Sequence, residues 1–207
     1  AAAEQKIRSL VEELIMKAKT WMSIFSEPNR FEEACKCYER AIQYTRESLL
    51  DEDLVGRLYE YGLFLHQNNQ FHRVEVYYQE ALTVFERLML NPKLEWSNVA
   101  LLLNNLASLY ADTKRFNKAE EYYLRALALC EQLATINSKL YESNVADTLL
   151  NLATLYSDTK FFREAEVYNL RALAIYERLA INNPETYEYN VALLLNNLAS
   201  LYADTQR

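Results

Sequence analysis

The sequence predicts an all-α fold, an array of helical hairpins, and three observations indicate it. The stretch NVALLLNNLASLYADT at residues 98–113 recurs unchanged at 190–205, and a looser copy at 144–159 makes the spacing 46 residues each time. Periods of about 20 to 50 residues are typical of repeat arrays, in which each unit contacts mainly its neighbours. Only two Gly and three Pro occur among 207 residues, and Ala, Leu, Glu and Tyr dominate, which favours helices. Apolar residues also recur at steps of three and four, as on one face of a helix.

A divergent first repeat is predicted over residues 4–49. Ile7, Val11 and Ile15 fall on one face of a helix over 4–25, and Pro28 interrupts the chain in a turn over 26–30. A second helix is expected over 31–49, so this repeat is one helical hairpin.

The second repeat is predicted over residues 53–90. Asp51 or Asp53 can cap its first helix, which we expect to run to residue 66. A turn over 67–70 leads to a second helix over 71–90, and Asn91 and Pro92 then break the helical pattern.

The later repeats are regular. Residues 98–143 and 144–189 agree at 27 of 46 positions, which indicates duplication. The first of these repeats predicts helices over 99–111 and 116–134 with a turn at 112–114. The connecting stretches INSKLYES (136–143) and INNPETYEY (181–189) are polar, and Pro184 lies in the second, so we expect surface turns there.

The fifth repeat, residues 190–207, contains only a first helix. The predicted array therefore has nine helices: four pairs and a lone ninth helix. We expect the chain to be a fragment of a longer array, or else to end on this lone helix.

The repeated residues resemble those of the tetratricopeptide repeat. Its pattern of a large residue, Leu, a small residue and Tyr, followed by Ala, an aromatic and Ala, matches Leu103, Leu106, Ala107, Tyr110, Ala119, Tyr123 and Ala126. The next repeat keeps the pattern except that Asn169 replaces the aromatic. The NVA entry, the paired Asn and the long second helix are similar to the repeats of kinesin light chains and their bacterial relatives. The likeness is close over residues 98–207 and loose over 20–97, and it implies one right-handed α-α superhelix over 1–207.

The side of the first helices that faces away from this framework is the candidate binding surface. At 100° per residue the framework residues fall on one side of the helix. The resemblance places the other side in a concave groove. The candidate residues there are Leu101, Asn104, Asn105, Ser108 and Asp112, with Asp147, Leu150, Asn151, Thr154 and Asp158, and then Asn196, Asn197, Ser200 and Asp204.

The paired asparagines allow two interpretations. Because an amide both donates and accepts hydrogen bonds, a row of them can pair with the backbone of an extended peptide. Alternatively, the same amides bond neighbouring helices or helix carbonyls. Leu150 takes the place of an Asn in the fourth repeat, where it interrupts the row and is a candidate pocket for an apolar side chain.

Charge and aromatic residues bear on the partner. The net charge is −7, from 22 basic and 29 acidic residues, so we expect either a solvated acidic face or a groove that selects a basic peptide. On the groove side Lys19 is the only obvious basic residue, which disfavours capture of a terminal carboxylate. Six framework tyrosines are expected in the core: Tyr38, Tyr78, Tyr110, Tyr123, Tyr156 and Tyr202. Four aromatic residues in the connecting stretches pack on helix ends or contact a partner: Trp96, Tyr141, Tyr187 and Tyr189.

Other classes of function lack support in the sequence. The acidic balance argues against nucleic acid, and no apolar run could span a membrane. No nucleophile, phosphate-loop or metal motif is present, so we predict no enzyme activity, no cofactor and no metal. Cys35, Cys37 and Cys130 are expected to be reduced and packed, which points weakly to the cytoplasm. The start AAAEQ is not a signal peptide, and one removed earlier stays an alternative.

The favoured function is therefore a scaffold, without catalysis, whose groove binds a protein segment or extended peptide. One alternative is an assembly module that self-associates through the open C-terminal helix. The other is an accessory repeat region of a larger protein.

Overall fold

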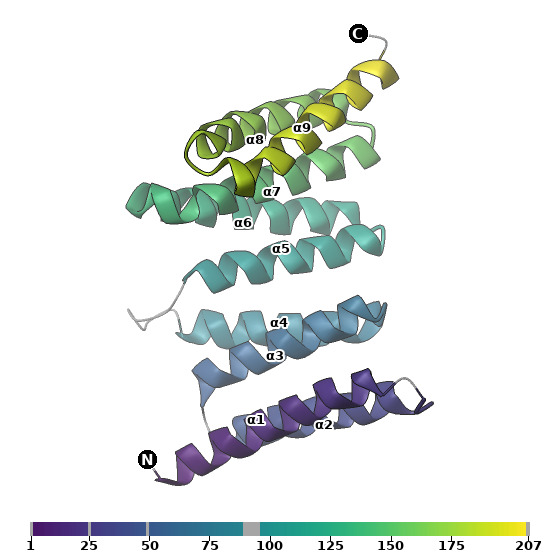
Figure 1. Cartoon of the computed structure of the whole chain (residues 1–207), viewed down its shortest axis with the longest axis vertical. Helices are drawn as coiled ribbons and strands as arrows, with labels where there is room; N and C mark the ends of the chain where they lie inside the picture. The colour runs from purple at the N-terminus through teal and green to yellow at the C-terminus, as the bar shows by residue number, and fades with distance from the viewer. Residues whose placement is uncertain (1, 25, 49, 89–95, 206–207) are drawn as a thin grey trace. The chain divides into compact units, whose positions relative to one another are not determined.

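The computed structural model describes residues 2–24, 26–48, 50–88 and 96–205, with only the backbone of residues 96 and 97. These residues form nine α-helices and no strand (Figure 1), which confirms the predicted all-α fold class. The chain divides into two compact units, residues 1–94 and 95–207, which are described separately. The predicted helix ends at 25, 49 and 90 and the predicted break at Asn91 and Pro92 lie outside the described residues.

Unit 1 contains two helical hairpins. Its helices are α1 (Ala2–Ser23), α2 (Arg30–Glu47), α3 (Asp51–Gln67) and α4 (Phe71–Leu88). Each first helix packs on its own second helix, and α2 also packs on α3. Helix backbones approach closely where a small residue faces an aromatic ring: a Cβ added to Gly62 would lie 2.2 Å from Cε1 of Tyr78.

Unit 2 contains two hairpins and a ninth helix. Its helices are α5 (Trp96–Asp112), α6 (Phe116–Ile136), α7 (Ser138–Asp158), α8 (Phe162–Asn182) and α9 (Pro184–Asp204). Consecutive helices pack on one another, and α5 also contacts α7. Ala107, Ala119, Ala126 and Ala153 are fully buried, because small side chains at these places let the helices approach.

The turns inside the second, third and fourth hairpins share one geometry. Asn69, Lys114 and Lys160 each follow a first helix with a positive φ, between 58° and 67°. At the second of these turns the amide of Lys114 donates to the carbonyl of Ala111, and the amide of Arg115 donates to that of Tyr110 over 2.7 Å. These two hydrogen bonds satisfy carbonyls at the helix end in the Schellman arrangement. The polypeptide therefore turns at the predicted residues 112–114 without a glycine.

The predicted surface turns between repeats are wrong over most of their length. Asn137 alone separates α6 from α7, and Asn183 alone separates α8 from α9. The side chain of Asn137 accepts a hydrogen bond from the amide of Leu140 over 3.3 Å, and Pro184 is the first residue of α9. Proline at this place lacks only an N–H that would have no helical partner, so it starts a helix rather than breaking one. The first helices of unit 2 are therefore longer than predicted.

The framework tyrosines lie in the core or at its edge. Four of them are buried: Tyr38, Tyr78, Tyr110 and Tyr123. Tyr156 and Tyr202 are half-buried, and their hydroxyls donate to carboxylates of the preceding second helix, Glu120 over 2.5 Å and Glu166 over 2.9 Å. This hydrogen bond recurs with the repeat and joins α6 to α7 and α8 to α9.

Candidate functional site

The two sides of the first helices in unit 2 differ as the helical spacing predicts. On α5 the framework residues Leu106 and Ala107 are fully buried, whereas Leu101 is 44% exposed. Seven other candidate residues are exposed: Asp112, Asp147, Thr154, Asp158, Asn196, Ser200 and Asp204. Six others are half-buried: Asn104, Asn105, Ser108, Leu150, Asn151 and Asn197. The candidates thus form a surface in which exposed carboxylates and hydroxyls flank partly buried amides.

Asn104 links α5 to α7. Its Nδ2 donates to Oγ1 of Thr148 over 2.9 Å and to the carbonyl of Ala100 over 3.1 Å. The Nδ2 of Asn151 lies 3.5 Å from Oδ1 of Asn104, at the long limit of a hydrogen bond. The structure therefore brings Asn104 and Asn151 together, and for this pair it fits the interpretation that the amides bond a neighbouring helix.

Thr148 is a buried polar neighbour of the candidate surface that helical spacing does not reveal. Its side chain is fully buried, its hydroxyl donates to the carbonyl of Asn144 over 2.8 Å, and the sulfur of Cys130 lies 3.9 Å away. One repeat further, the residues equivalent to Asn104 and Thr148 are Leu150 and Leu194. A polar pair is thus replaced by an apolar pair at the same register, and this paired change is the signal that could have found Thr148.

Asp147 occupies the place of Leu101 in the next repeat and makes a different contact. The hydroxyl of the buried Tyr176 donates to its Oδ1, and the Tyr176 ring lies 5.9 Å from the Tyr187 ring of α9. Burial raises the pKa of the Asp147 carboxyl, and the hydrogen bond from Tyr176 opposes that shift; part of the residue remains open to solvent. The predicted surface therefore carries a carboxylate that α8 holds in place.

Glu142 lies on the same helix and has the opposite shift. The hydroxyl of Ser138 donates to it over 2.7 Å, and Arg178 of α8 lies 3.1 Å from its other oxygen. The hydrogen bond from Ser138 is the larger cause that lowers the pKa of the Glu142 carboxyl, and Arg178 adds to it. This carboxylate is therefore stabilised as an anion.

Charge is distributed unevenly between the helices of unit 2. The first helices α5, α7 and α9 carry a single basic residue, Lys139, against seven acidic ones: Asp112, Glu142, Asp147, Asp158, Glu185, Glu188 and Asp204. The second helices α6 and α8 carry five basic residues, Lys118, Arg125, Arg163, Arg171 and Arg178, against six acidic ones, Glu120, Glu121, Glu131, Glu164, Glu166 and Glu177, so they are close to neutral. The side that the first helices contribute is therefore the acidic one.

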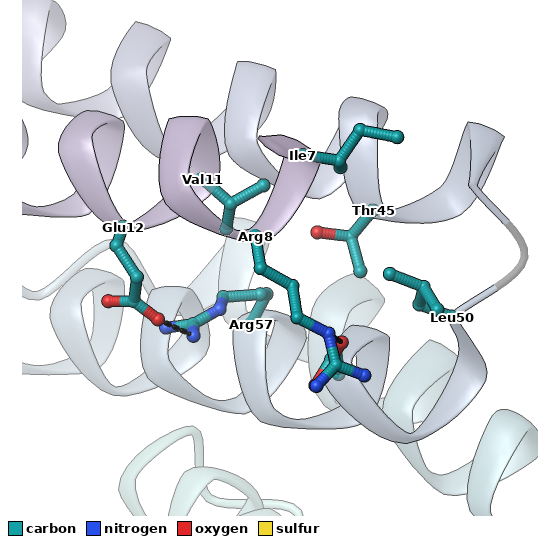
Figure 2. A pocket seen from close by; sticks show the side chains of 8 residues that line it. Ile7, Arg8, Val11, Glu12, Thr45, Leu50 and Arg57 are labelled. Atoms are coloured by element: carbon teal, nitrogen blue, oxygen red, sulfur yellow. Dashed lines mark hydrogen bonds and ion pairs between the residues drawn. The ribbon is translucent and has the colours of Figure 1, made fainter. Parts of the chain in front are cut away.

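In unit 1 the seam between the first helices is held by ion pairs. Arg8 of α1 pairs with Asp53 of α3 over 3.0 Å, and Arg57 of α3 pairs with Glu12 of α1. Figure 2 shows these side chains bridging the two helices around a small cavity. The expectation that Lys19 is the only basic residue of this side is wrong, because Arg8 and Arg57 also lie along the seam. Their charges are far apart in sequence from the acids that pair with them, so helical spacing within one helix did not reveal them.

The aromatic residues of the connecting stretches separate into two kinds. Tyr187 is half-buried and packs beside Tyr176, whereas Tyr189 is 76% exposed. Tyr141 is half-buried, and the side chain of Trp96 lies outside the described residues. Packing on helix ends thus accounts for Tyr187. Tyr189 is exposed and stays a candidate for contact with a partner at the rim of the surface.

Other kinds of site are not built in the part of the chain that the structure describes. No three His, Cys, Asp or Glu side chains gather there in a way that could hold a metal ion. None of its helices is both long and apolar enough to cross a membrane.

The architecture is similar to that of known repeat proteins. The sequence model of the tetratricopeptide repeat matches residues 98–178, and no curated protein matches the sequence. The crystal structure of BtubC (BKLC) from P. vanneervenii is similar with a TM-score of 0.65 and 20% identity, over 97% of this chain and 84% of that one. Nearly identical TPR-like repeats assigned to a kinesin light chain of Podosopora anserina give a TM-score of 0.57 and 17% identity, over 98% and 97% of the two chains.

At these identities the solved structures bear on the fold alone, and the fold agrees with the family match. Such repeats generally serve as scaffolds for protein interaction. Residues 98–178 thus match the tetratricopeptide repeat family, and the helices on either side continue the same all-helical architecture.

Proposed function

We propose that the first-helix surface of unit 2 binds an extended segment of a partner protein that carries basic side chains. The observation that carries this proposal is the charge distribution, since α5, α7 and α9 together hold seven acidic residues against Lys139. An acidic surface attracts basic partners and repels acidic ones, so charge contributes selectivity and a faster encounter. A scaffold without catalysis suffices for this role.

The amides contribute unequally to the proposed binding. Asn104 already donates to Thr148, so its main role is to join α5 and α7. Asn196 is exposed on α9, and Ser200 is exposed one turn later. These two side chains can therefore hydrogen-bond a peptide backbone without first breaking a contact between helices.

Short labelled peptides that alternate serine with arginine, glutamine or glutamate test the proposal by fluorescence anisotropy. The arginine peptide is expected to bind, the glutamine peptide to bind several-fold more weakly, and the glutamate peptide not to bind. The variant Asn196→Ala/Ser200→Ala is expected to weaken binding of the arginine peptide by about fivefold, the loss of roughly one net hydrogen bond. Equal affinity for all three peptides would refute charge selection. An unchanged affinity of the variant would show that the amide of Asn196 does not take part in binding.

A second candidate function is self-association through α9. Leu195 is 50% exposed, although its equivalents Leu103 and Leu149 are 4% and 0% exposed. Ala199 is likewise exposed, whereas Ala107 is fully buried. The same residues that are buried in the third repeat thus form an open apolar strip on α9. Light scattering tests this function: mass that rises with concentration and stays monomeric in Leu195→Asp supports it, and a monomer at every concentration contradicts it.

A further inference from the structure

One face of α8 combines exposed apolar side chains with cations. Val167, Leu170 and Ile181 are 55%, 45% and 81% exposed. At 100° per residue they share an arc of about 100° with four other exposed residues. The seven residues of this arc, here called the α8 stripe, are Arg163, Val167, Leu170, Arg171, Ala174, Arg178 and Ile181. Single exposed apolar side chains are ordinary, whereas a contiguous set of them marks an interaction surface.

The equivalent arc of α6 shows that the fold does not require the composition of the α8 stripe. Its seven residues are also exposed: Asn117, Glu121, Leu124, Arg125, Ala128, Gln132 and Thr135. Two polar residues of this arc become apolar in the next repeat, Glu121 to Val167 and Thr135 to Ile181. Two others become arginine, Asn117 to Arg163 and Gln132 to Arg178. All four changes therefore add apolar surface or positive charge, and they leave no acid in the α8 stripe.

Neighbouring helices hold two of the arginines in place. Nη2 of Arg171 lies 2.7 Å from Glu131 of α6, and Nη2 of Arg178 lies 3.1 Å from Glu142 of α7. The two arginine side chains nevertheless remain 46% and 58% exposed. A guanidinium has five N–H donors, so one such pair leaves others for a second carboxylate. The arginines are therefore positioned to bind an acidic partner in a fixed geometry.

The spacing of the α8 stripe fits a partner helix better than an extended segment. Its apolar members follow one another at steps of three, four and seven residues, which is the period of a helix and not of a strand. From residue 163 to residue 181 the stripe is about 27 Å long, or five turns. A second helix packs on such rows of side chains by placing its own into the grooves between them. Ala174 is the small residue at the centre, where two helices can approach closely.

We propose that the α8 stripe binds an amphipathic helix of a partner protein, one whose apolar face is flanked by glutamate or aspartate. The apolar side chains of that helix pack on Val167, Leu170 and Ile181, and its carboxylates accept hydrogen bonds from the arginines. A basic helix of the same shape is repelled. This inference does not depend on the proposed function, because it concerns other residues and a partner of the opposite charge.

Two synthetic helices test the proposal with the whole chain. The first repeats the heptad Ala-Leu-Glu-Gln-Glu-Leu-Ala three times, which places leucines at steps of three and four with glutamates beside them. The second has lysine in place of every glutamate. By calorimetry the glutamate helix is expected to bind one per protein chain, and the lysine helix at least about tenfold more weakly. No binding of the glutamate helix, or equal affinity for both, would overturn the proposal.

The duplication provides matched variants. Val167→Glu/Ile181→Thr gives α8 the residues that α6 has at these exposed places, and it is expected to weaken binding of the glutamate helix at least about tenfold. Arg163→Asn/Arg178→Gln is expected to weaken it about fivefold. Circular dichroism should show the helix content of the parent protein in both. Unchanged affinity in either variant would contradict the assignment to the α8 stripe.

The reverse exchange tests whether these residues are sufficient. Asn117→Arg/Glu121→Val/Gln132→Arg/Thr135→Ile gives α6 the same composition and is expected to raise the number of bound glutamate helices from one to two. A stoichiometry that stays at one would overturn the proposal.

Phosphatidylcholine vesicles with and without phosphatidylserine distinguish a lipid surface from a helix site. The parent protein is expected to pellet with neither. Pelleting with the anionic vesicles that Val167→Glu/Ile181→Thr abolishes would overturn the proposal, since the stripe would then contact lipid. None of these probes or variants involves the first helices, so a negative result leaves the test with serine–arginine peptides unaffected.

Discussion

Gly62 shows how a side chain on the other helix of a hairpin limits the size of the residue that it faces. In the later repeats the equivalent place is occupied by Ala107, Ala153 and Ala199, which by sequence alone favours alanine here too. The ring of Tyr78, however, is fully buried and lies so close that an added Cβ would be 2.2 Å from Cε1. Such a distance cannot persist, so the ring or the helix must move.

Replacement of the two glycines of α3 is therefore expected to have opposite effects. Gly62→Ala should lower the free energy of unfolding by about 1–2 kcal/mol, because overpacking outweighs the gain in helix propensity. Gly56→Ala is the matched control on the same helix, since no atom lies within 4 Å of the added Cβ. It should raise the free energy of unfolding by about 0.5–1 kcal/mol. Urea unfolding measures both, and a stabilised Gly62→Ala variant would contradict the packing described.

Asn104 and Asn196 provide a second matched pair, because they lie at the same place in identical stretches. Asn104 donates to Thr148 and to the carbonyl of Ala100, whereas Asn196 is exposed. Asn104→Ala should therefore cost about 1 kcal/mol of unfolding free energy, and Asn196→Ala well under half of that. A double-mutant cycle with Thr148→Val should show coupling of about 0.5–1 kcal/mol. Equal costs for the two alanine variants would show that the hydrogen bond to Thr148 does not stabilise the repeat.

At the scale of the helices, the single residues between repeats set where each first helix begins. Asn137 caps α7 through its side chain, whereas the side chain of Asn183 makes no such hydrogen bond at the start of α9. Asn137→Ala should lower the free energy of unfolding by about 0.5–1 kcal/mol and Asn183→Ala by less. Thermal unfolding of the two variants measures the difference. A larger loss for Asn183→Ala would contradict the assigned cap.

The helical hairpins could be predicted from the sequence because two periods reinforce each other, the spacing of apolar residues and the repeat of 46 residues. The stretches 136–143 and 181–189 were mistaken for turns because polar residues and Pro184 suit loops as well as the first turn of a helix. Whether such a stretch forms a loop or the first turn of a helix depends on the residue that precedes it. Here those residues are Asn137 and Asn183, each of which alone separates two helices.

The candidate surface could be predicted only in part. Helical spacing separated the buried Leu106 from the exposed Leu101, since this depends on one helix alone. It could not separate Asn104 from Asn196, because their difference comes from Thr148 on α7, to which Asn104 donates. The ion pairs of Arg8 and Arg57 likewise join residues far apart in sequence. The contacts between helices could thus not be predicted from the sequence.

At the scale of the whole molecule, buried tyrosines predict how the fold responds to alkaline pH. Burial is the main cause that raises the pKa of Tyr38 and of Tyr123 from 10.0 to about 12. Because the raised value belongs to the folded state, their contribution to stability is complete below pH 10 and is lost as pH rises toward 12. The contribution of these two tyrosines to the unfolding free energy should therefore be constant below about pH 9.5 and fall above pH 10, together with the appearance of tyrosinate absorbance.

Tyr123→Phe is the control for this response. The phenylalanine ring keeps the packing and cannot ionise, so the fall in stability above pH 10 should become shallower in the variant. An identical slope in both proteins would mean that Tyr123 titrates normally in the folded state and would contradict its burial.

The acidic first-helix surface of unit 2 is the feature on which the proposed function depends. Its charge can be reduced without touching the framework, because Asp112 and Asp158 are exposed at the ends of α5 and α7. Glu121 and Glu177 are exposed on the second helices and provide a control with the same change of charge. Any difference between the two double variants therefore reports where a basic peptide binds and not the net charge of the protein.

The most direct measurement is the affinity of the alternating serine–arginine peptide for these two variants, determined by isothermal titration calorimetry at one salt concentration. Asp112→Asn/Asp158→Asn is expected to weaken binding by about fivefold, roughly 1 kcal/mol, as for two partly screened surface charges. Glu121→Gln/Glu177→Gln is expected to bind like the parent protein. Equal weakening in both variants, or a loss confined to the second-helix variant, would contradict the assignment of the binding surface to the first helices.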